Sequence, residues 1–161
     1  MQTKGNRAAA SEGIKMPVQI KLASLWASFM FLYAYVDILG FYKPGVIDDI
    51  LVGRVWELEI TQTWAVGALA LMAIPISMVF LSVTLPARAN RTTNIVVASL
   101  YLVVSVGNAV GESWAYYFAL AAGLEVAMLA LVLRYAWTWR RSTSPENPGL
   151  SAERMQPVGR R

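Results

Sequence analysis

Glu125 is the residue of this chain whose position most suggests chemistry. It lies ten residues into an apolar run that begins at Ala115, which is about 15 Å along a helix. In a membrane that depth is near the bilayer midplane, where a charged side chain costs about 2.5–3.5 kcal/mol. Tyr33 and Asn108 lie at about the same depth in their own runs. Glu125 is therefore a candidate proton-accepting or ligand-binding group. The alternative is a neutral carboxyl group, hydrogen-bonded to Asn108 or a tyrosine, that holds two helices in register.

Asp37 is a second candidate, near the end of an earlier apolar run. Trp26, Met30, Tyr33 and Asp37 follow the i, i+4, i+7, i+11 spacing of one helix face. This face combines two aromatic rings with a carboxylate near the outer side of a membrane, where they could line a cavity. The alternative is a face packed inside a bundle, with Asp37 bonded to the loop that follows.

A group of carboxylates is expected to make one membrane face acidic. Its members are Asp37, Asp48, Asp49, Glu57, Glu59 and Glu112. Divalent cations prefer clustered oxygen ligands, but this spacing matches no cation-binding loop. We therefore expect a solvated acidic rim and no metal site.

Four apolar runs must position these side chains. They cover about residues 20–42, 63–85, 93–111 and 115–139, and each is close to the roughly 20 residues that cross a bilayer as a helix. A soluble bundle would show polar stripes every three or four residues, and the second run has none. We predict an all-α transmembrane four-helix bundle formed by residues 19–140.

The basic residues indicate the orientation of this bundle. Twelve of the 14 Lys and Arg residues lie before or at the start of the first run, between the second and third, or near and after the end of the fourth. Only Lys43 and Arg54 lie in the connections on the other side. Because cytoplasmic loops hold excess positive charge, we expect both termini in the cytoplasm. The basic residues are expected to contact anionic lipid there, and not nucleic acid.

The remaining segments are less apolar. Residues 1–18 and 141–161 are rich in Gly, Pro and charge, and we expect disordered cytoplasmic tails. In the outer loop 43–62, residues 44–53 predict a short amphipathic helix lying on the outer membrane face. The alternating residues 54–60 predict an extended segment.

Two local features concern how the helices bend and pack. Pro75 predicts a kink or a freed carbonyl within the second run, and residues 86–92 predict a tight turn. Small residues at four-residue spacing allow close helix contact in lipid. Such residues occur at Gly107 and Gly111, and again at Ala119, Gly123 and Ala127.

The chain contains no Cys and no His. This composition excludes a disulfide framework, a thiol relay and a zinc–thiolate site, and it removes the commonest haem ligand. A serine–histidine catalytic set is excluded as well, and no glycine-rich phosphate loop is present. We expect no cofactor and no enzymatic activity.

Four segments within about residues 18–140 are distinctive: LWASFMFLYAYVDILGFYKPG, ITQTW, LMAIPISMVFLSVTLPARANR and GESWAYY. Together they resemble a family of small bacterial four-helix membrane proteins catalogued as a domain of unknown function. The resemblance implies a bacterial inner membrane and four helices, and it transfers no activity. The architecture is also similar, more loosely, to that of DoxX-like proteins.

Two functions fit these features. The first is a non-enzymatic accessory protein, or a binder of a small molecule or lipid, with an acidic outer-facing pocket. The second is a small oligomeric proton-coupled transporter or channel that uses Glu125 and Asp37. A membrane enzyme that acts through paired carboxylates has the least support. A homo-oligomer or a membrane partner protein is compatible with either of the first two functions.

Overall fold

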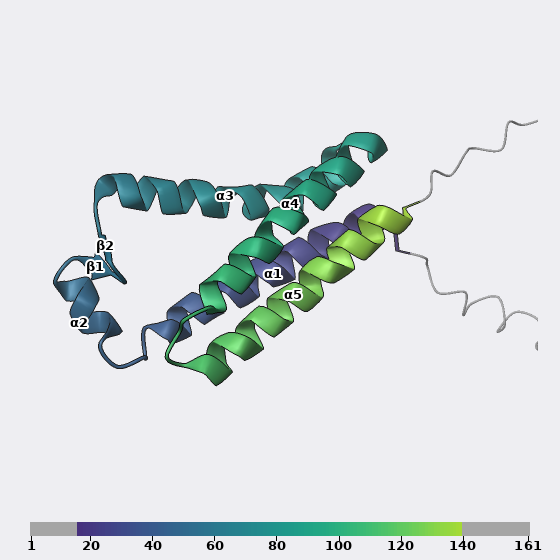
Figure 1. The fold of residues 1–161 in the computed structure, drawn as a ribbon. Helices are drawn as coiled ribbons and strands as arrows, with labels where there is room; N and C mark the ends of the chain where they lie inside the picture. Colours follow the sequence, from purple (N-terminus) through teal and green to yellow (C-terminus); the bar gives the residue numbers. More distant parts are fainter. Residues whose placement is uncertain (1–15, 140–161) are drawn as a thin grey trace, which may run out of the picture.

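Four long helices make up most of the computed structural model, which describes residues 16–139 (Figure 1). The tails expected to be disordered lie outside this range, apart from residues 16–18. Each long helix has the length and apolar composition to cross a membrane: α1 (Val18–Gly40), α3 (Gln62–Thr84), α4 (Ala87–Ala109) and α5 (Ala115–Thr138). The predicted all-α fold with four such helices is confirmed.

Three short elements connect α1 to α3. They are the helix α2 (Val46–Leu51) and the strands β1 (Arg54–Val55) and β2 (Leu58–Glu59), which pair antiparallel. The predicted short helix is therefore present, whereas residues 54–60 form two paired strands separated by a turn and not the single extended segment that was predicted. Trp56, in the turn between the strands, has a left-handed backbone with φ of 52°. This conformation costs a bulky residue about 1–3 kcal/mol, so contacts made by Trp56 must hold it.

The two ends of the molecule carry different segments. We call the end with α2, the two strands and the α4–α5 connection (110–114) the loop end. The opposite end, where α1 begins, α5 ends and α3 turns into α4, is the tail end. Figure 1 shows α1, α4 and α5 running side by side, while α3 diverges from them toward the loop end. The four helices therefore pack together only toward the tail end.

An aromatic core fills the middle of the molecule and its tail-end half. Trp26, Phe29 and Tyr101 are buried and meet edge to face, with ring centroids 5.8–6.5 Å apart. Buried aliphatic side chains surround the rings: Leu22, Met78, Leu129 and Val132. This half of the molecule is densely packed and positions the helices that diverge above it.

Pro75 marks the level at which α3 leaves the others. Because proline has no N–H, the carbonyl of Leu71 loses its partner within the helix. The Tyr101 hydroxyl of α4 donates a hydrogen bond to that carbonyl oxygen. The predicted freed carbonyl is therefore present, and it fastens α3 to α4 at this point.

Helix α4 begins at Ala87, so the turn predicted over residues 86–92 is wrong beyond Pro86. Its first two turns are polar, and for that reason the apolar run did not include them. Asn90 lies in these turns, is fully buried, and donates to the carbonyl of Ser82 at 2.6 Å. That carbonyl has no helical partner, because the residue four positions on is Pro86.

Asn94 joins three helices in the tail-end half. Its Oδ1 accepts from Trp26 Nε1 at 2.7 Å and from the Ser82 hydroxyl at 3.4 Å. Its Nδ2 donates to Asn90 Oδ1 at 2.6 Å. All four side chains are completely buried, and an unpaired polar atom there would be costly.

The predicted contact through small residues is wrong. A side-chain carbon added at Gly107, Gly111 or Gly123 would meet no atom within 4 Å. Ala119 and Ala127 are exposed as well. These small residues therefore face away from the other helices, whereas the buried alanines of α4 and α5 are Ala98, Ala121 and Ala136.

Candidate functional site: a cavity at the loop end

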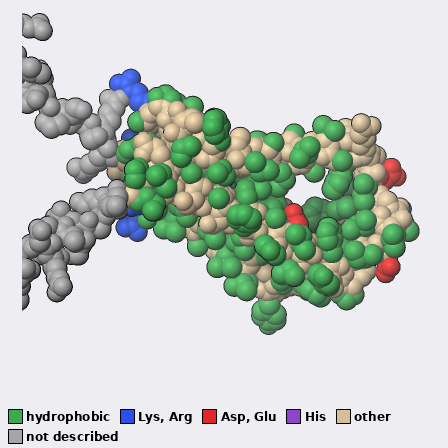
Figure 2. Space-filling model, turned by 180° about the vertical axis from the view of Figure 1, so that it is seen from behind, with side chains coloured by type: hydrophobic (Ala, Val, Ile, Leu, Met, Phe, Trp, Pro, Cys, Tyr) green, Lys and Arg blue, Asp and Glu red, His purple; other side chains and the backbone are tan. Residues whose placement is uncertain are grey.

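A cavity of about 840 Å³ lies in the loop-end half, where α3 diverges from the other helices. Figure 2 shows it as an opening through the surface, with acidic atoms at its edge. The α3 wall carries no charged side chain and consists mainly of Trp64, Gly67, Ala68, Leu71 and Met72. All of these residues precede Pro75, because α3 closes on its neighbours beyond it.

The opposite wall holds most of the predicted site. Tyr33 and Asp37 of α1, Asn108 of α4 and Glu125 of α5 all face this cavity, and Glu112 lies at its loop end. Five of the six candidate residues therefore line one space. Tyr33 and Asp37 line the cavity because they continue the face of α1 that is buried in the core nearer the tail end.

Glu125 is the most buried of the lining carboxyl groups, with 4% of its surface exposed. Its neighbour in the wall is Ser105, which is 1% exposed. Among the described residues, the Ser105 hydroxyl has no hydrogen-bond partner of acceptable geometry. The expected bond from Asn108 to Glu125 is absent there, and the Asn108 amide donates instead to the Tyr33 hydroxyl at 2.7 Å.

Asp37 is exposed to the cavity. In the described part of the chain it makes no ion pair and no side-chain hydrogen bond, so its expected bond to the following loop is not found. The end of α1 is held by another contact, since the Tyr117 hydroxyl donates to the Val36 carbonyl at 2.7 Å. Asp37 is thus a carboxyl group on a fixed backbone whose oxygens are free to meet a ligand.

Trp26 does not reach the cavity. It is fully buried in the aromatic core and bonded to Asn94. The predicted face of α1 does place Tyr33 and Asp37 together in the cavity wall. Trp26 lies on the same helix about two turns nearer the tail end than Tyr33, below the cavity. Its role here is in packing.

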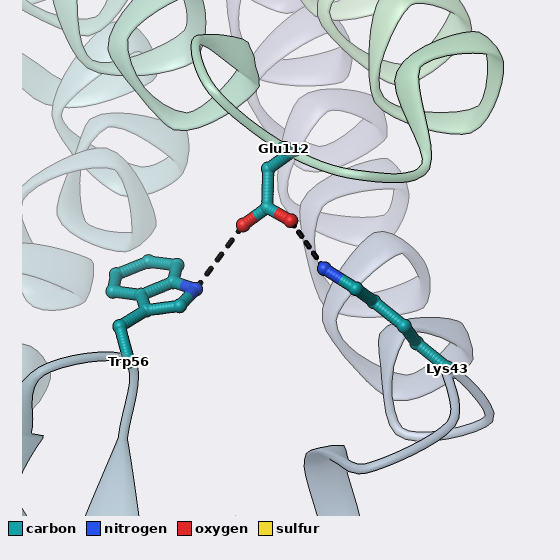
Figure 3. A network of polar contacts seen from close by, with 3 residues as sticks. All are labelled: Lys43, Trp56 and Glu112. Carbon is teal, nitrogen blue, oxygen red and sulfur yellow. Dashed lines mark hydrogen bonds and ion pairs between the residues drawn. The ribbon is translucent and has the colours of Figure 1, made fainter.

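Glu112 bridges two segments at the loop end and is not part of a solvated rim (Figure 3). One oxygen pairs with Lys43 Nζ at 2.5 Å, and the other accepts from Trp56 Nε1 at 3.1 Å. The Glu112 side chain is 11% exposed. These bonds connect the α4–α5 connection to the end of α1 and to the strained turn of the strand pair, and they close the cavity at this end. Sequence spacing did not indicate this network, since Glu112 is more than 50 residues away from each of its two partners.

The charged groups of the lining are mostly acidic. They comprise four carboxylates and two bases: Asp37, Asp49, Glu112, Glu125, Lys43 and Arg54. The bond between Lys43 and Glu112 leaves three acids against one base. Within residues 16–139, no three or more of these acidic groups are close enough together to hold a metal ion.

The four apolar helices define a multi-pass membrane protein, here with a cavity between one diverging helix and three packed ones. The chain belongs to the family of unknown function DUF6326, which matches residues 15–145. The match extends over most of the chain and agrees with the resemblance to a membrane protein family of unknown function. No curated protein and no solved structure matches the chain.

Proposed function

We propose that this protein binds an amphipathic small molecule or lipid in the loop-end cavity and has no enzymatic activity. The cavity itself is the observation that carries the proposal. Its volume of about 840 Å³ lies within the roughly 300–1,000 Å³ of typical ligand sites, which are mostly apolar with a few converging polar groups. The uncharged α3 wall suits the apolar part of such a ligand, and the opposite wall suits its polar group.

The opening between α3 and its neighbours supports entry of the ligand from the bilayer. The α3 residues around it belong to a helix that is apolar enough to cross the membrane. A molecule dissolved in the bilayer would therefore reach the cavity without crossing a polar barrier.

A channel or transporter has less support than a binding protein. Glu125 and Asp37 do face the same space, as a proton-carrying pair would. The aromatic core and the buried Asn94 cluster fill the tail-end half below them, so the described residues leave the cavity without a path to the tail end. Transport would require a second arrangement of α3.

Photolabelling in lipid nanodiscs tests the binding proposal. The probe is a long-chain alcohol with a diazirine in its chain, and labelled positions are mapped by mass spectrometry. We expect labels on cavity-facing residues of α1 and α3, and their loss in Ala68→Trp, which fills the space. The matched control is Ala73→Trp, an exposed position on the side of the same helix turned away from the cavity, which should keep them. Labelling confined to outward-facing residues, or unchanged by Ala68→Trp, would overturn the proposal.

We further propose a bacterial inner-membrane location with both termini in the cytoplasm. Four of the six described basic residues lie at the tail end: Lys21, Arg88, Arg91 and Arg134. Figure 2 shows Lys and Arg at the end where α1 begins and α5 ends, and Asp and Glu toward the other end. Lys21 and Arg91 lie over the rings of Tyr135 and Trp137 at 5.4 and 5.6 Å, an arrangement suited to an interface with anionic lipid.

The orientation is testable because the chain has no cysteine. Ser113→Cys at the loop end should react with a membrane-impermeant maleimide in intact bacterial cells. Thr92→Cys, near the tail end, should react only after the cells are permeabilised. The reverse pattern would contradict the proposed orientation.

A further inference from the structure

We propose that the ligand of this cavity carries an organic cation of the ammonium type, whose positive charge lies between Asp37 and Glu125. This inference rests on the proposed binding function and names the chemical class of its ligand. It is carried by three features of the lining: unpaired carboxyl groups, aromatic rings and an unpartnered buried hydroxyl.

The carboxyl groups come first. Asp37 and Glu125 face the same space and are close enough for their charges to interact. Neither forms an ion pair among residues 16–139, where the ion pair present is that of Lys43 with Glu112. Carboxylates within a membrane are costly unless a positive charge faces them. A bound cation would supply that charge, whereas an anionic ligand would be repelled.

The other charged groups of the lining do not neutralise this pair. Lys43 is held by Glu112 at the loop end. Arg54 and Asp49 belong to the α2–strand segment that covers the cavity, and they offset each other in charge. The net negative charge therefore remains on the wall formed by α1 and α5.

Aromatic rings form the second feature. Five of them line the cavity: Tyr33, Phe41, Trp56, Trp64 and Phe118. An ammonium group is attracted to the face of such a ring, and aromatic side chains recognise quaternary ammonium ligands in this way. The lining already contains one such contact, since Lys43 Nζ lies 5.6 Å from the ring centre of Phe118.

The third feature is Ser105, whose buried hydroxyl lines the cavity beside the Glu125 carboxyl group but makes no hydrogen bond of acceptable geometry with any described residue. Buried hydroxyl groups are normally hydrogen-bonded, so this oxygen is available to a polar group of the ligand beside Glu125. A metal ion fits less well than an organic cation. The described residues offer no group of three close carboxylates, and the α3 wall is apolar.

A set of probes with one diazirine-bearing alkyl chain and different headgroups tests the inference. The headgroups are hydroxyl, trimethylammonium, sulfonate and phosphocholine, and the half-saturating mole fraction in nanodiscs is measured for each. We expect the trimethylammonium probe to saturate the cavity at about one tenth of the mole fraction of the alcohol, which corresponds to about 1.4 kcal/mol. The sulfonate should bind most weakly. The phosphocholine arm distinguishes the source of the cation: binding equal to trimethylammonium indicates a lipid headgroup, and weaker binding indicates a free organic cation.

Matched variants assign the preference to the two carboxyl groups. Asp37→Asn and Glu125→Gln keep the shape of the side chain and should each reduce the preference for trimethylammonium over alcohol about threefold or more, as expected for loss of a partly desolvated charge pair. Asp48→Asn makes the same charge change on α2 outside the cavity and should leave the preference unchanged.

The headgroup comparison can be made in the wild-type protein alone, so it remains a test even if a variant fails to fold. Cavity labelling by the alcohol without a preference for the cation would overturn this inference alone, whereas no cavity labelling by any probe would overturn the binding function.

Discussion

Replacing Asn94 with alanine should destabilise the protein by removing the centre of its buried polar cluster. Asn94 Oδ1 is the acceptor for Trp26 Nε1 at 2.7 Å, and Asn94 Nδ2 donates to Asn90. Both partners are completely buried. In Asn94→Ala the Trp26 N–H would remain in an apolar core without an acceptor.

The structure sets the size of this effect. A buried donor left unpaired costs about 1–3 kcal/mol, while single hydrogen bonds between membrane helices average about 0.6 kcal/mol and reach about 1.7. Asn94→Ala removes an interhelical bond to Trp26, a longer one to Ser82, and the side chain that filled the space. We therefore expect a loss of about 2 kcal/mol in the free energy of unfolding.

Reversible unfolding in mixed micelles at increasing dodecyl sulfate provides the measurement. Asn108→Ala is the matched control, because it makes the same change on the same helix at an exposed position with one bond, to Tyr33. Only that single bond is lost in the control, so it should cost about 0.6 kcal/mol or less. Equal losses in the two variants would refute the assignment of Asn94 to a sealed core.

Two further predictions concern the attachment of α3 and the closure of the loop end. Tyr101→Phe removes the donor that satisfies the Leu71 carbonyl and should cost about 1 kcal/mol in the same unfolding measurement, whereas Tyr116→Phe, at a 95% exposed ring, should cost nothing measurable. Glu112→Gln breaks a partly buried ion pair and should accelerate amide hydrogen exchange across residues 44–60 about fivefold, the factor for about 1 kcal/mol of lost local stability. Unchanged exchange would show that this network does not hold the loop end.

Hydrophobicity and the positions of prolines predicted those parts of the fold that depend on residues close together in the sequence. The lengths of the apolar runs predicted the four helices, and Pro75 predicted the free carbonyl at Leu71. The start of α4 was missed, because Asn90 is polar and its burial depends on the Ser82 carbonyl of another helix. No local pattern contains that information.

The candidate site was predictable to a similar degree. Depth along each helix brought Tyr33, Asn108 and Glu125 to one level, and they do face one cavity. Pro75 marks the level at which α3 diverges and the cavity begins, but the direction of the divergence depends on how the helices pack at the tail end, which the α3 sequence does not contain. The bridge from Glu112 to Lys43 and Trp56 was missed for the same reason, since it connects segments that meet only in the folded chain.

The most direct test of the central claim is a native mass spectrum of the protein, released from the membranes in which it was produced. The binding function predicts an added mass at about one molecule per chain, retained by Ala73→Trp and lost from Ala68→Trp, which fills the cavity lined by Ala68. A protein that carries no added mass under conditions that preserve bound lipid would contradict the account. So would an added mass that survives Ala68→Trp.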